Sequence, residues 1–339
     1  MSDDGIPYEI YDWHADYSDW NVGSTFDATP IKVTEPDRGN AVWYKHPKAD
    51  CKVSTPIMTT TRSGTCITAM LVAAMVTLVA FAPVALACGR DTDCTIGKRT
   101  YRIAFPDGQS DARPTGAIIF VHGYRGNAKD VMRNQALVAV ATDVGLAFIA
   151  AEAAGVEWNL PGVPSVDATS GIDELAYFDA LLADAIKRFG IDPTRITVSG
   201  FSSGAMMVWY LACYRGTSFA GFVPMSGTFW KPIPLACPTG SVNLIHYHGT
   251  EDPIVPLEGR QIKDGHQGDV LKAFDLLTRS GNFGPIKTEQ HAELKCSRRF
   301  SSDHRFIELC LFPGYHQLVP KYLSRAWQEI VSKKTGLAK

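Results

Sequence analysis

Apolar runs of strand length alternate with segments of helical period over most of the chain beyond residue 100. The run Ala117 to Val121 is apolar throughout and rich in β-branched residues, which is typical of a strand buried on both faces. An edge-like strand is predicted at Thr100 to Phe105, and further runs of strand length predict strands at Leu146 to Ala150, Ile196 to Val198, Gly221 to Met225, Val242 to Tyr247 and Phe306 to Phe312. Strands separated by helical segments predict an α/β fold with a mostly parallel sheet and helices on both faces.

The predicted helices follow from apolar residues spaced three and four positions apart. From Glu174 to Phe189 this spacing places five side chains on one helix face, namely Leu175, Phe178, Leu182, Ile186 and Phe189. Further helices are predicted at Ala128 to Ala141, Ala205 to Cys213, Asp269 to Thr278 and Lys321 to Val331. In a sheet of this kind, a functional site is expected beyond the carboxyl ends of the strands.

An almost wholly apolar segment, Ile67 to Ala82, lies near the start of the chain after a basic residue. The small-residue sequence Ala85-Leu86-Ala87 follows it. A basic flank, an apolar stretch and an Ala-x-Ala end predict a secretory signal peptide over residues 58–87, cleaved before Cys88. The alternative is an uncleaved membrane anchor over residues 66–87, since the segment approaches the length that spans a bilayer.

Cleavage at this point would divide the chain into three parts. Residues 1–57 are then an upstream extension that is either disordered or the result of a misplaced start, and residues 88–339 form one α/β catalytic domain. A secreted protein, extracellular or periplasmic, follows from cleavage, and membrane association is expected only if the segment stays uncleaved. The near-neutral net charge of −2 indicates no nucleic-acid partner, and the composition predicts no oligomeric state.

Six cysteines remain in the predicted mature part of the chain, an even number that suits disulfides in an oxidising compartment. Proximity along the chain favours the pairs Cys88 with Cys94, Cys213 with Cys237, and Cys296 with Cys310. The alternative is that one or more of them are buried free thiols. We expect no metal site and no cofactor, because no Cys-x-x-Cys pair with histidines at ligand spacing occurs.

The stretch Gly200-Phe201-Ser202-Ser203-Gly204 has the form Gly-x-Ser-x-Gly between a predicted strand and a predicted helix. In this context the chain turns sharply at the central serine and exposes its hydroxyl at the carboxyl edge of the sheet. Small glycines are needed on either side because backbone approaches backbone closely there. Ser202 is therefore the candidate nucleophile, since neither Ser199 nor Ser203 is centred between the two glycines.

A serine nucleophile needs a base to take its proton and an acid to orient that base. In this type of fold the acid and then the histidine follow the serine along the chain. Asp252 comes just after a predicted strand, in a loop stiffened by two prolines, and is preferred over its neighbour Glu251. The alternative for Asp252 is a turn-forming residue before proline. The preferred base is His316, which follows a strand and precedes the last helix, whereas the other downstream candidates lie in polar segments: His266, His291 and His304.

Two backbone N–H groups are expected to bind the oxyanion that develops during acyl transfer. One is assigned to Ser203, the residue after the nucleophile. The other is assigned to Tyr124 in the loop after the strand Ala117 to Val121, with Gly123 allowing close approach. Three other histidines are predicted to be hydrogen-bonded scaffold residues: His122, His246 and His248.

From Cys88 onwards the chain resembles the secreted α/β-hydrolase esterases of the polyhydroxybutyrate depolymerase and feruloyl esterase group. The residues that carry the resemblance are Cys88-Gly89, Asp93-Cys94, Tyr101-Arg102-Ile103, His122-Gly123, Gly200 to Gly204, Met206-Met207, Leu211-Ala212-Cys213, Pro224 to Gly227, His248 to Asp252 and Gly314-Tyr315-His316. The resemblance implies an α/β-hydrolase fold in which Ser202, Asp252 and His316 cleave a carboxylic ester through an acyl-enzyme.

Two departures from that family concern the residues around the site. Tyr315 stands between Gly314 and His316, where the family often has Gly-His-x-Trp-Pro, and Ala205 stands where a second glycine is more usual. Both positions flank the expected acyl pocket. Four aromatic residues are candidates for lining the pocket, with ordinary packing as the alternative: Trp158, Phe229, Trp230 and Tyr315.

The predicted function is that of a secreted serine carboxylic-ester hydrolase without a cofactor. The expected substrate is a hydroxyalkanoate polymer or oligomer, or a feruloyl or acetyl ester of plant polysaccharide. A peptidase or acyltransferase on the same triad is the alternative, because one fold and triad serve several reactions. A non-catalytic binding protein is disfavoured, since all three triad residues are present.

Overall fold

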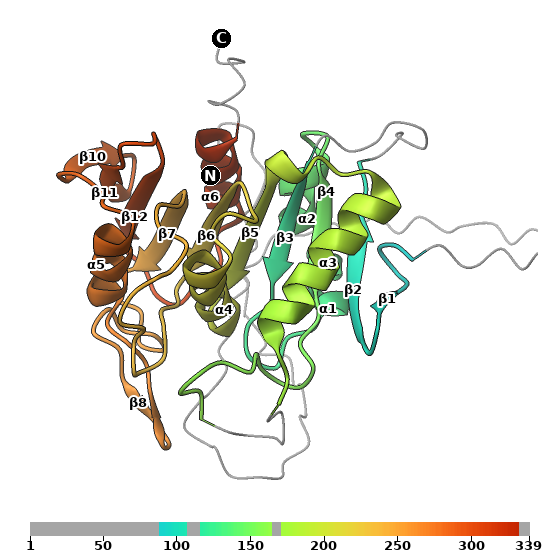
Figure 1. Ribbon diagram of the computed structural model, residues 1–339, viewed down its shortest axis with the longest axis horizontal. Helices are drawn as coiled ribbons and strands as arrows, with labels where there is room; N and C mark the ends of the chain where they lie inside the picture. Colours follow the sequence, from blue (N-terminus) through green and yellow to red (C-terminus); the bar gives the residue numbers. More distant parts are fainter. Residues whose placement is uncertain (1–87, 107–115, 165–170, 332–339) are drawn as a thin grey trace, which may run out of the picture. The chain divides into compact units, whose positions relative to one another are not determined.

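Within residues 88–106, 116–164 and 171–331, a computed structural model shows one ten-stranded sheet with helices on both faces (Figure 1). Across the sheet the strands are β1 (Cys94–Ile96), β2 (Arg99–Ala104), β4 (Ala147–Ala151), β3 (Ala117–Val121), β5 (Ile196–Phe201), β6 (Gly221–Met225), β7 (Leu244–Gly249), β12 (Phe306–Phe312), β11 (Leu294–Phe300) and β10 (Lys287–His291). A separate two-stranded hairpin consists of β8 (Gln261–Ile262) and β9 (Gly265–His266).

The six central strands, from β4 to β12 in this order, run parallel, and antiparallel strands flank them on both sides. Every residue of β3, β4, β6 and β7 is buried, as the continuous apolar runs predict for strands that are covered on both faces. The mostly parallel α/β sheet predicted from the sequence is thereby confirmed.

The helices lie in two layers on opposite faces of the sheet (Figure 1). They are α1 (Ala128–Arg133), α2 (Gln135–Thr142), α3 (Glu174–Phe189), α4 (Ser203–Tyr214), α5 (Val270–Ser280) and α6 (Pro320–Ile330), with a 3₁₀ turn at Pro193–Arg195. Helices α3, α4 and α5 share one apolar core with the sheet, and α1, α2 and α6 share the other. The sheet therefore separates two cores and brings its strand ends to the rim between them.

Helix α3 has the predicted bounds, but its buried face differs from the predicted one. Asp173 caps the first turn by accepting the N–H of Ala176, and Gly190 ends the helix in the left-handed conformation. The fully buried apolar side chains are Tyr177, Phe178, Leu181 and Ala185, with Leu175, Leu182, Ile186 and Phe189 partly buried beside them. The most deeply buried face of α3 is therefore shifted by about one residue from the predicted apolar face.

The single helix expected from residue 128 to 141 is two helices in the structure. Asn134 ends α1, and its side chain accepts the N–H of Leu137 to cap α2. Strands β10 and β11 were not predicted from the sequence. Strand β10 reads Lys-Thr-Glu-Gln-His and is mostly exposed, so it has no apolar pattern of its own. Its pairing with β11, rather than apolar residues of its own, places it at the sheet edge.

Three disulfides join cysteines that are neighbours along the chain, the pairs that chain proximity favours. They are Cys88–Cys94, Cys213–Cys237 and Cys296–Cys310. The second ties the end of α4 to the loop after β6, and the third bridges directly opposed residues of β11 and β12. By restricting the unfolded chain, a disulfide that closes a loop of this size stabilises a domain by about 2–4 kcal/mol.

The predicted signal segment and upstream extension lie outside the described residues. Among the residues that the structure describes, none of the helices combines the length and apolarity required to cross a bilayer.

Replacing Gly204 by Ala tests the packing of α4 against β3. A Cβ at this position would overlap the backbone carbonyl groups of Val121 and His122, which have no freedom to move aside. Ala normally favours a helix by about 1 kcal/mol over Gly, but we expect the overlap to reverse the sign. Gly204→Ala should lower the free energy of unfolding by about 3 kcal/mol in urea denaturation.

Gly89→Ala is the matched control, because its added Cβ would lie 3.9 Å from the nearest neighbouring atom, the carbonyl oxygen of Ile103. We expect this variant to stay within about 0.5 kcal/mol of the parent. Equal stability of the two variants would contradict the close backbone approach at Gly204.

Candidate functional site

Ser202 lies at a sharp corner between β5 and α4, with φ of 57° and ψ of −123°. This conformation is strained for a residue with a Cβ and costs on the order of 1–3 kcal/mol. The N–H of Ser202 donates to the carbonyl of Met225 at 3.0 Å, which anchors the corner to β6. A Cβ at Gly200 would lie 2.6 Å from the Gly204 carbonyl, so glycine is required where the strand and the helix cross. The tight serine turn predicted from the motif is present.

Asp252 follows β7 and is 5% exposed. Its Oδ1 accepts the N–H groups of Ile254 at 2.9 Å and Val255 at 2.8 Å, and its Oδ2 accepts Nδ1–H of His316 at 2.7 Å. Burial by itself would raise the pKa of Asp252, but the hydrogen bond and charge of His316, together with the Val255 N–H, outweigh it. The pKa is therefore lowered, and the carboxylate is ionised at neutral pH and acts only as an acceptor.

Backbone contacts hold the loop of Asp252 against the loop of His316. The N–H of Thr250 donates to the carbonyl of Phe312, and the N–H of Glu251 donates to the carbonyl of Gly314, both at 2.9 Å. A Cβ at Gly249 would overlap the carbonyl oxygens of Gly314 and Tyr315. The two loops, far apart in sequence, are thus joined at the ends of the neighbouring parallel strands β7 and β12.

One ring nitrogen of His316 is hydrogen-bonded to Asp252, and the other has no hydrogen-bond partner among the described residues. Because the Asp252 carboxylate can only accept, Nδ1 carries the proton in the hydrogen bond between them. In the neutral ring Nε2 then has a lone pair, and it is buried without a hydrogen-bond partner among the described residues. The ring lies 4.7 Å from that of Phe201, the residue before Ser202. The structure therefore brings the predicted acid and base together beside the serine turn.

The two predicted oxyanion donors lie in segments that adjoin Ser202. Ser203 is the first residue of α4, where helix N–H groups have no carbonyl partner within the helix. Gly123 lies against the serine, since a Cβ there would be 3.4 Å from Ser202 Cβ. This is an ordinary contact distance, so the approach of the Tyr124 loop does not by itself require glycine at position 123.

His122 holds the loop that carries Tyr124. Its Nδ1–H donates to the carbonyl of Gly123 at 2.8 Å, and its Nε2 accepts the N–H of Ala153 at 3.2 Å. The indole of Trp158 donates to the carbonyl of His122 at 2.8 Å. Burial lowers the pKa of His122 to about 4, against the opposing effect of the hydrogen bond to Gly123. The imidazole is therefore neutral at neutral pH, as both hydrogen bonds require.

Two of the four aromatic residues expected at the pocket belong to the core. Trp158 is fully buried and packs on His122, in the loop that carries Tyr124, and on Phe178. Phe229 is also fully buried, 4.9 Å from the ring of Tyr210 on α4. Both positions correspond to the packing alternative, because a strand end near the site can direct a large side chain inward.

The other two aromatic residues differ from each other. Trp230 is 5% exposed and forms an antiparallel bridge with Gln267, so it also lies beneath the surface. Tyr315 is 62% exposed and immediately precedes His316. Tyr315 is therefore the one residue of the four whose ring a ligand can contact without rearrangement.

Two buried histidines on β7 were predicted only as scaffold residues. His246 and His248 are both 0% exposed and hydrogen-bonded to each other at 2.9 Å. His248 also contacts the carbonyl of Val255 in the loop that carries Asp252. The signal in the sequence was their spacing of two residues on a strand that leads to the acid, which places both rings on the same face.

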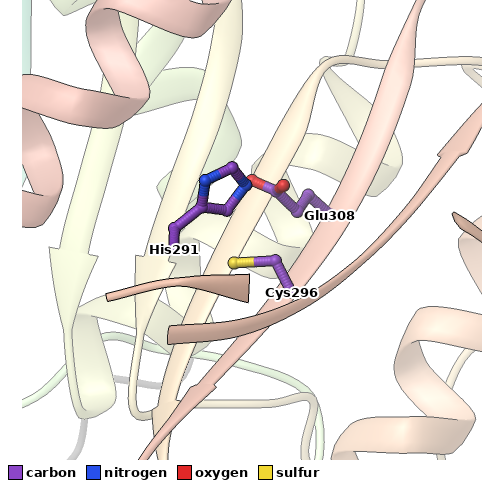
Figure 2. Close-up of side chains that lie close together, drawn as sticks. All are labelled: His291, Cys296 and Glu308. Carbon is purple, nitrogen blue, oxygen red and sulfur yellow. The ribbon is translucent and has the colours of Figure 1, made fainter. Parts of the chain in front are cut away.

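Among the described residues, one group of three potential metal ligands lies close together: His291, Cys296 and Glu308 (Figure 2). The sulfur of Cys296 is bonded to Cys310, and a disulfide sulfur is not the thiolate that binds metals. His291 is paired with Glu289 at 3.2 Å. The ligand atoms are thus already engaged in other interactions.

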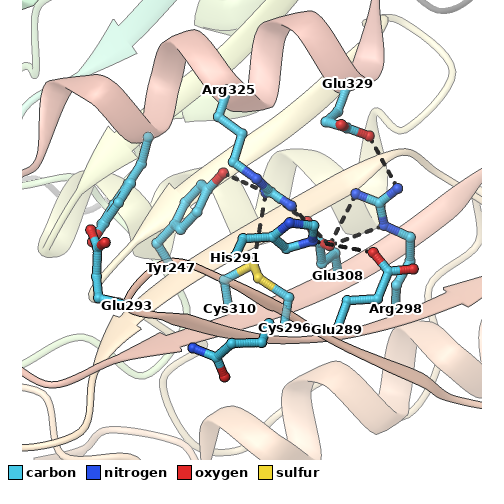
Figure 3. The surroundings of a disulfide bond; sticks show 12 residues. Tyr247, Glu289, His291, Glu293, Cys296, Arg298, Glu308, Cys310, Arg325 and Glu329 are labelled. Carbon is cyan, nitrogen blue, oxygen red and sulfur yellow. Dashed lines mark hydrogen bonds and ion pairs between the residues drawn. A yellow bond between two sulfur atoms is a disulfide. The ribbon is translucent and has the colours of Figure 1, made fainter.

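Glu308 is fully buried and lies between two arginines (Figure 3). Arg298 contacts Oε1 at 3.0 Å, and Arg325 contacts Oε2 at 2.9 Å and also donates to the hydroxyl of Tyr247. Two guanidinium groups compensate the buried carboxylate and would repel a cation. This cluster is best described as a buried ion-pair network that joins β11, β12 and α6.

Comparison with known proteins gives a family for this arrangement. Residues 108–277, half of the chain, match the phospholipase/carboxylesterase family. The candidate esterase NocK of Nocardia uniformis subsp. tsuyamanensis is 27% identical over 163 residues, which is 48% of this chain and 47% of that protein. Feruloyl esterase C of Emericella nidulans is 25% identical over 207 residues, which is 56% of this chain and 72% of that protein.

The match to NocK thus spans less than half of that relative's length. Among solved structures, acetyl xylan esterase from Aspergillus awamori has a TM-score of 0.52 and 13% identity, covering 71% of this chain and 99% of that one. At this identity the likeness concerns the fold alone. Together with the parallel sheet and the serine turn, the matched segment shows that this chain belongs to the phospholipase/carboxylesterase family and has the α/β-hydrolase fold.

Proposed function

We propose that the protein is a secreted serine hydrolase of carboxylic esters, with Ser202 as nucleophile, His316 as base and Asp252 as acid. The observation that carries the proposal is the hydrogen bond between Asp252 and Nδ1 of His316, beside a serine in a strained strand-to-helix turn. It leaves Nε2 of His316 as the basic nitrogen. This is the order of groups that activates a serine hydroxyl.

In the proposed reaction, Ser202 Oγ attacks the ester carbonyl carbon while Nε2 of His316 takes its proton. The resulting imidazolium is stabilised by the ionised carboxylate of Asp252, which stays unprotonated. Collapse of the tetrahedral intermediate releases the alcohol, which receives the proton from His316 and leaves an acyl-serine. Water then attacks the acyl group with His316 again as base, which releases the acid and restores the hydroxyl.

The oxyanion is proposed to accept hydrogen bonds from the N–H groups of Ser203 and Tyr124. The carbonyl of the peptide between Gly123 and Tyr124 accepts from His122 and from the N–H of Gly126. In a trans peptide the N–H points away from the carbonyl, so fixing one fixes the other. His122 thereby supports the direction of the proposed Tyr124 donor.

The proposed substrate is an ester with an aromatic or short hydroxylated acyl group. Relatives named feruloyl esterase C support the aromatic class. Hydroxybutyrate oligomers are the second class to test, because the sequence motifs resemble those of polyhydroxybutyrate depolymerases. The exposed ring of Tyr315 beside His316 offers an aromatic surface at the rim. Three disulfides support export to an oxidising compartment.

Replacing Ser202 by Ala tests the nucleophile. We expect kcat for a p-nitrophenyl ester to fall by about 10⁴–10⁶, because the acyl-enzyme cannot form. Ser199→Ala, on β5, removes a buried hydroxyl that donates to the carbonyl of Val223 on β6 and should retain activity. Hydrolysis by Ser202→Ala at the parent rate would refute the proposed nucleophile.

An activity panel tests the substrate class. We expect methyl ferulate or hydroxybutyrate oligomers to be cleaved with higher kcat/KM than p-nitrophenyl esters of long acyl chains. Matched amides and acceptor alcohols should give hydrolysis of esters as the main reaction. Faster cleavage of the amides would favour a peptidase, and predominant acyl transfer to alcohols would favour an acyltransferase.

The low pKa of His122 predicts how stability depends on pH. The unfolded chain binds a proton at its ordinary His pKa near 6.5, whereas folded His122 does so only near pH 4. The stability from this group is complete above pH 6.5 and is lost as the pH falls toward 4, a change of about 3 kcal/mol.

His122→Gln should remove this part of the pH dependence when urea unfolding is measured between pH 4 and 7. His291→Gln, which changes a half-exposed histidine, should leave the pH dependence close to that of the parent. If His122→Gln and the parent keep parallel curves, His122 is not neutral in the folded protein at these pH values.

A further inference from the structure

Behind the proposed acid lies a chain of hydrogen bonds through two buried imidazoles. His246 Nε2 and His248 Nδ1 are 2.9 Å apart, and His248 Nε2 lies 2.7 Å from the carbonyl oxygen of Val255. Both histidines are on β7 and have no exposed surface. The reaction proposed above does not use either of them.

The protons on the two imidazoles can be assigned by starting from the Val255 carbonyl. The Val255 carbonyl can only accept, so Nε2 of His248 carries a proton. Burial lowers the pKa of His248 and lowers that of His246 well below its usual value, so both rings are neutral. His248 Nδ1 is then the acceptor, and His246 Nε2–H is the donor between the two rings.

The same residue that accepts from His248 also holds the acid. Val255 donates its N–H to Oδ1 of Asp252 at 2.8 Å, and Oδ2 of Asp252 accepts from His316. His248 therefore fixes the backbone of Val255 on its carbonyl side while Asp252 is held from its amide side. A shift of this segment would move the carboxylate relative to His316.

At the other end of this row of hydrogen bonds, His246 packs against α4, the helix that begins after Ser202. His246 lies 5.3 Å from the ring of Trp209 on α4, and the Trp209 indole donates to the carbonyl of Gly227 at 3.1 Å. Gly227 in turn packs on the backbone of Ser202, where an added Cβ would lie 2.7 Å from the Ser202 carbonyl oxygen. The network thus connects the serine turn to the acid through the core.

The charge of these rings also matters for the acid. His248 Nε2 is 3.6 Å from Oδ2 of Asp252, close enough for an ion pair if the ring were protonated. The titratable groups that face His248 are His246, Asp252 and His316. Because His248 is neutral, the negative charge of Asp252 remains available to stabilise the imidazolium of His316.

We infer that His248 is a positioning residue for Asp252, acting through the Val255 carbonyl, and that His246 supports the ring of His248 through the hydrogen bond between them. The inference rests on the proposed esterase function and concerns how its acid is held. A pair of core histidines that only stabilises the fold is the competing explanation.

The test compares His248→Gln with His248→Asn. A Gln side chain places its amide NH₂ near the position of His Nε2 and can donate to the Val255 carbonyl. An Asn side chain is one methylene shorter and reaches only the position of Nδ1, so it can accept from His246 but cannot reach Val255. The two variants therefore separate the two hydrogen bonds of His248 with nearly the same chemistry.

We expect His248→Asn to lower kcat about 10- to 100-fold with little change in KM, because a shift of about 1 Å in a catalytic group has effects of this size. The acid limb of its kcat/KM profile should move to lower pH, since a displaced carboxylate stabilises the imidazolium less. His248→Gln should retain kcat within about threefold of the parent and keep the parent pH profile.

Rates are expressed per active site, titrated with a fluorophosphonate, so that misfolded protein does not count. His291→Asn serves as a control for histidine removal and should retain the parent rate and pH profile. Parent kcat and pH profile in His248→Asn, or equal losses in both His248 variants, would overturn the positioning role. A His248→Asn protein that fails to fold while His248→Gln is folded but slow would overturn it as well.

Failure of the proposed function has a different signature. If the parent protein hydrolyses no ester and the fluorophosphonate does not label Ser202, the esterase proposal fails and the role of His248 fails with it. If the parent is active and labelled at Ser202 but His248→Asn behaves like the parent, only the positioning role is refuted.

Discussion

Backbone contact at the serine turn is the constraint on which the rest of the site depends. Ser202, between β5 and α4, has a positive φ, and α4 starts so close to β3 that a side chain at Gly204 would overlap the carbonyls of Val121 and His122. The same contact places the loop after β3 next to Ser202. Proposed nucleophile and oxyanion loop are therefore positioned by one packing arrangement, and the hydrogen bond from Ser202 N–H to β6 retains the strained turn.

The proposed acid and base depend on a second backbone arrangement. Parallel pairing of β7 with β12 brings their carboxyl ends together, and the hydrogen bonds of Thr250 and Glu251 join the two following loops. The side chains of Asp252 and His316 then need only short reaches to meet at 2.7 Å. The strand pairing and the hydrogen bonds between the loops explain why both residues can lie on loops and still be held with little freedom, as preorganised catalysis requires.

The features predictable from the sequence are those with local causes. Strands β3, β6 and β12 have the predicted bounds because their residues are apolar with the single exception of Glu308, and the serine turn follows from two glycines at fixed spacing. Strand β10 was missed because only its partner makes it a strand. Trp158 and Phe229 lie in the core because distant helices cover them, a fact that no spacing near the motif contains.

The histidines show how one residue type is divided between two tasks. Burial keeps His122, His246 and His248 neutral, so each can donate from one nitrogen and is suited to holding a backbone group in place. His316 differs because a buried carboxylate accepts its Nδ1–H, which leaves Nε2 as the nitrogen that takes the proton in the proposed reaction. A protonated His248 would form an ion pair with Asp252, and a protonated His122 could no longer accept the N–H of Ala153. Burial therefore keeps three histidines neutral as supports for the backbone, and the hydrogen bond to Asp252 distinguishes the fourth, His316, as the proposed base.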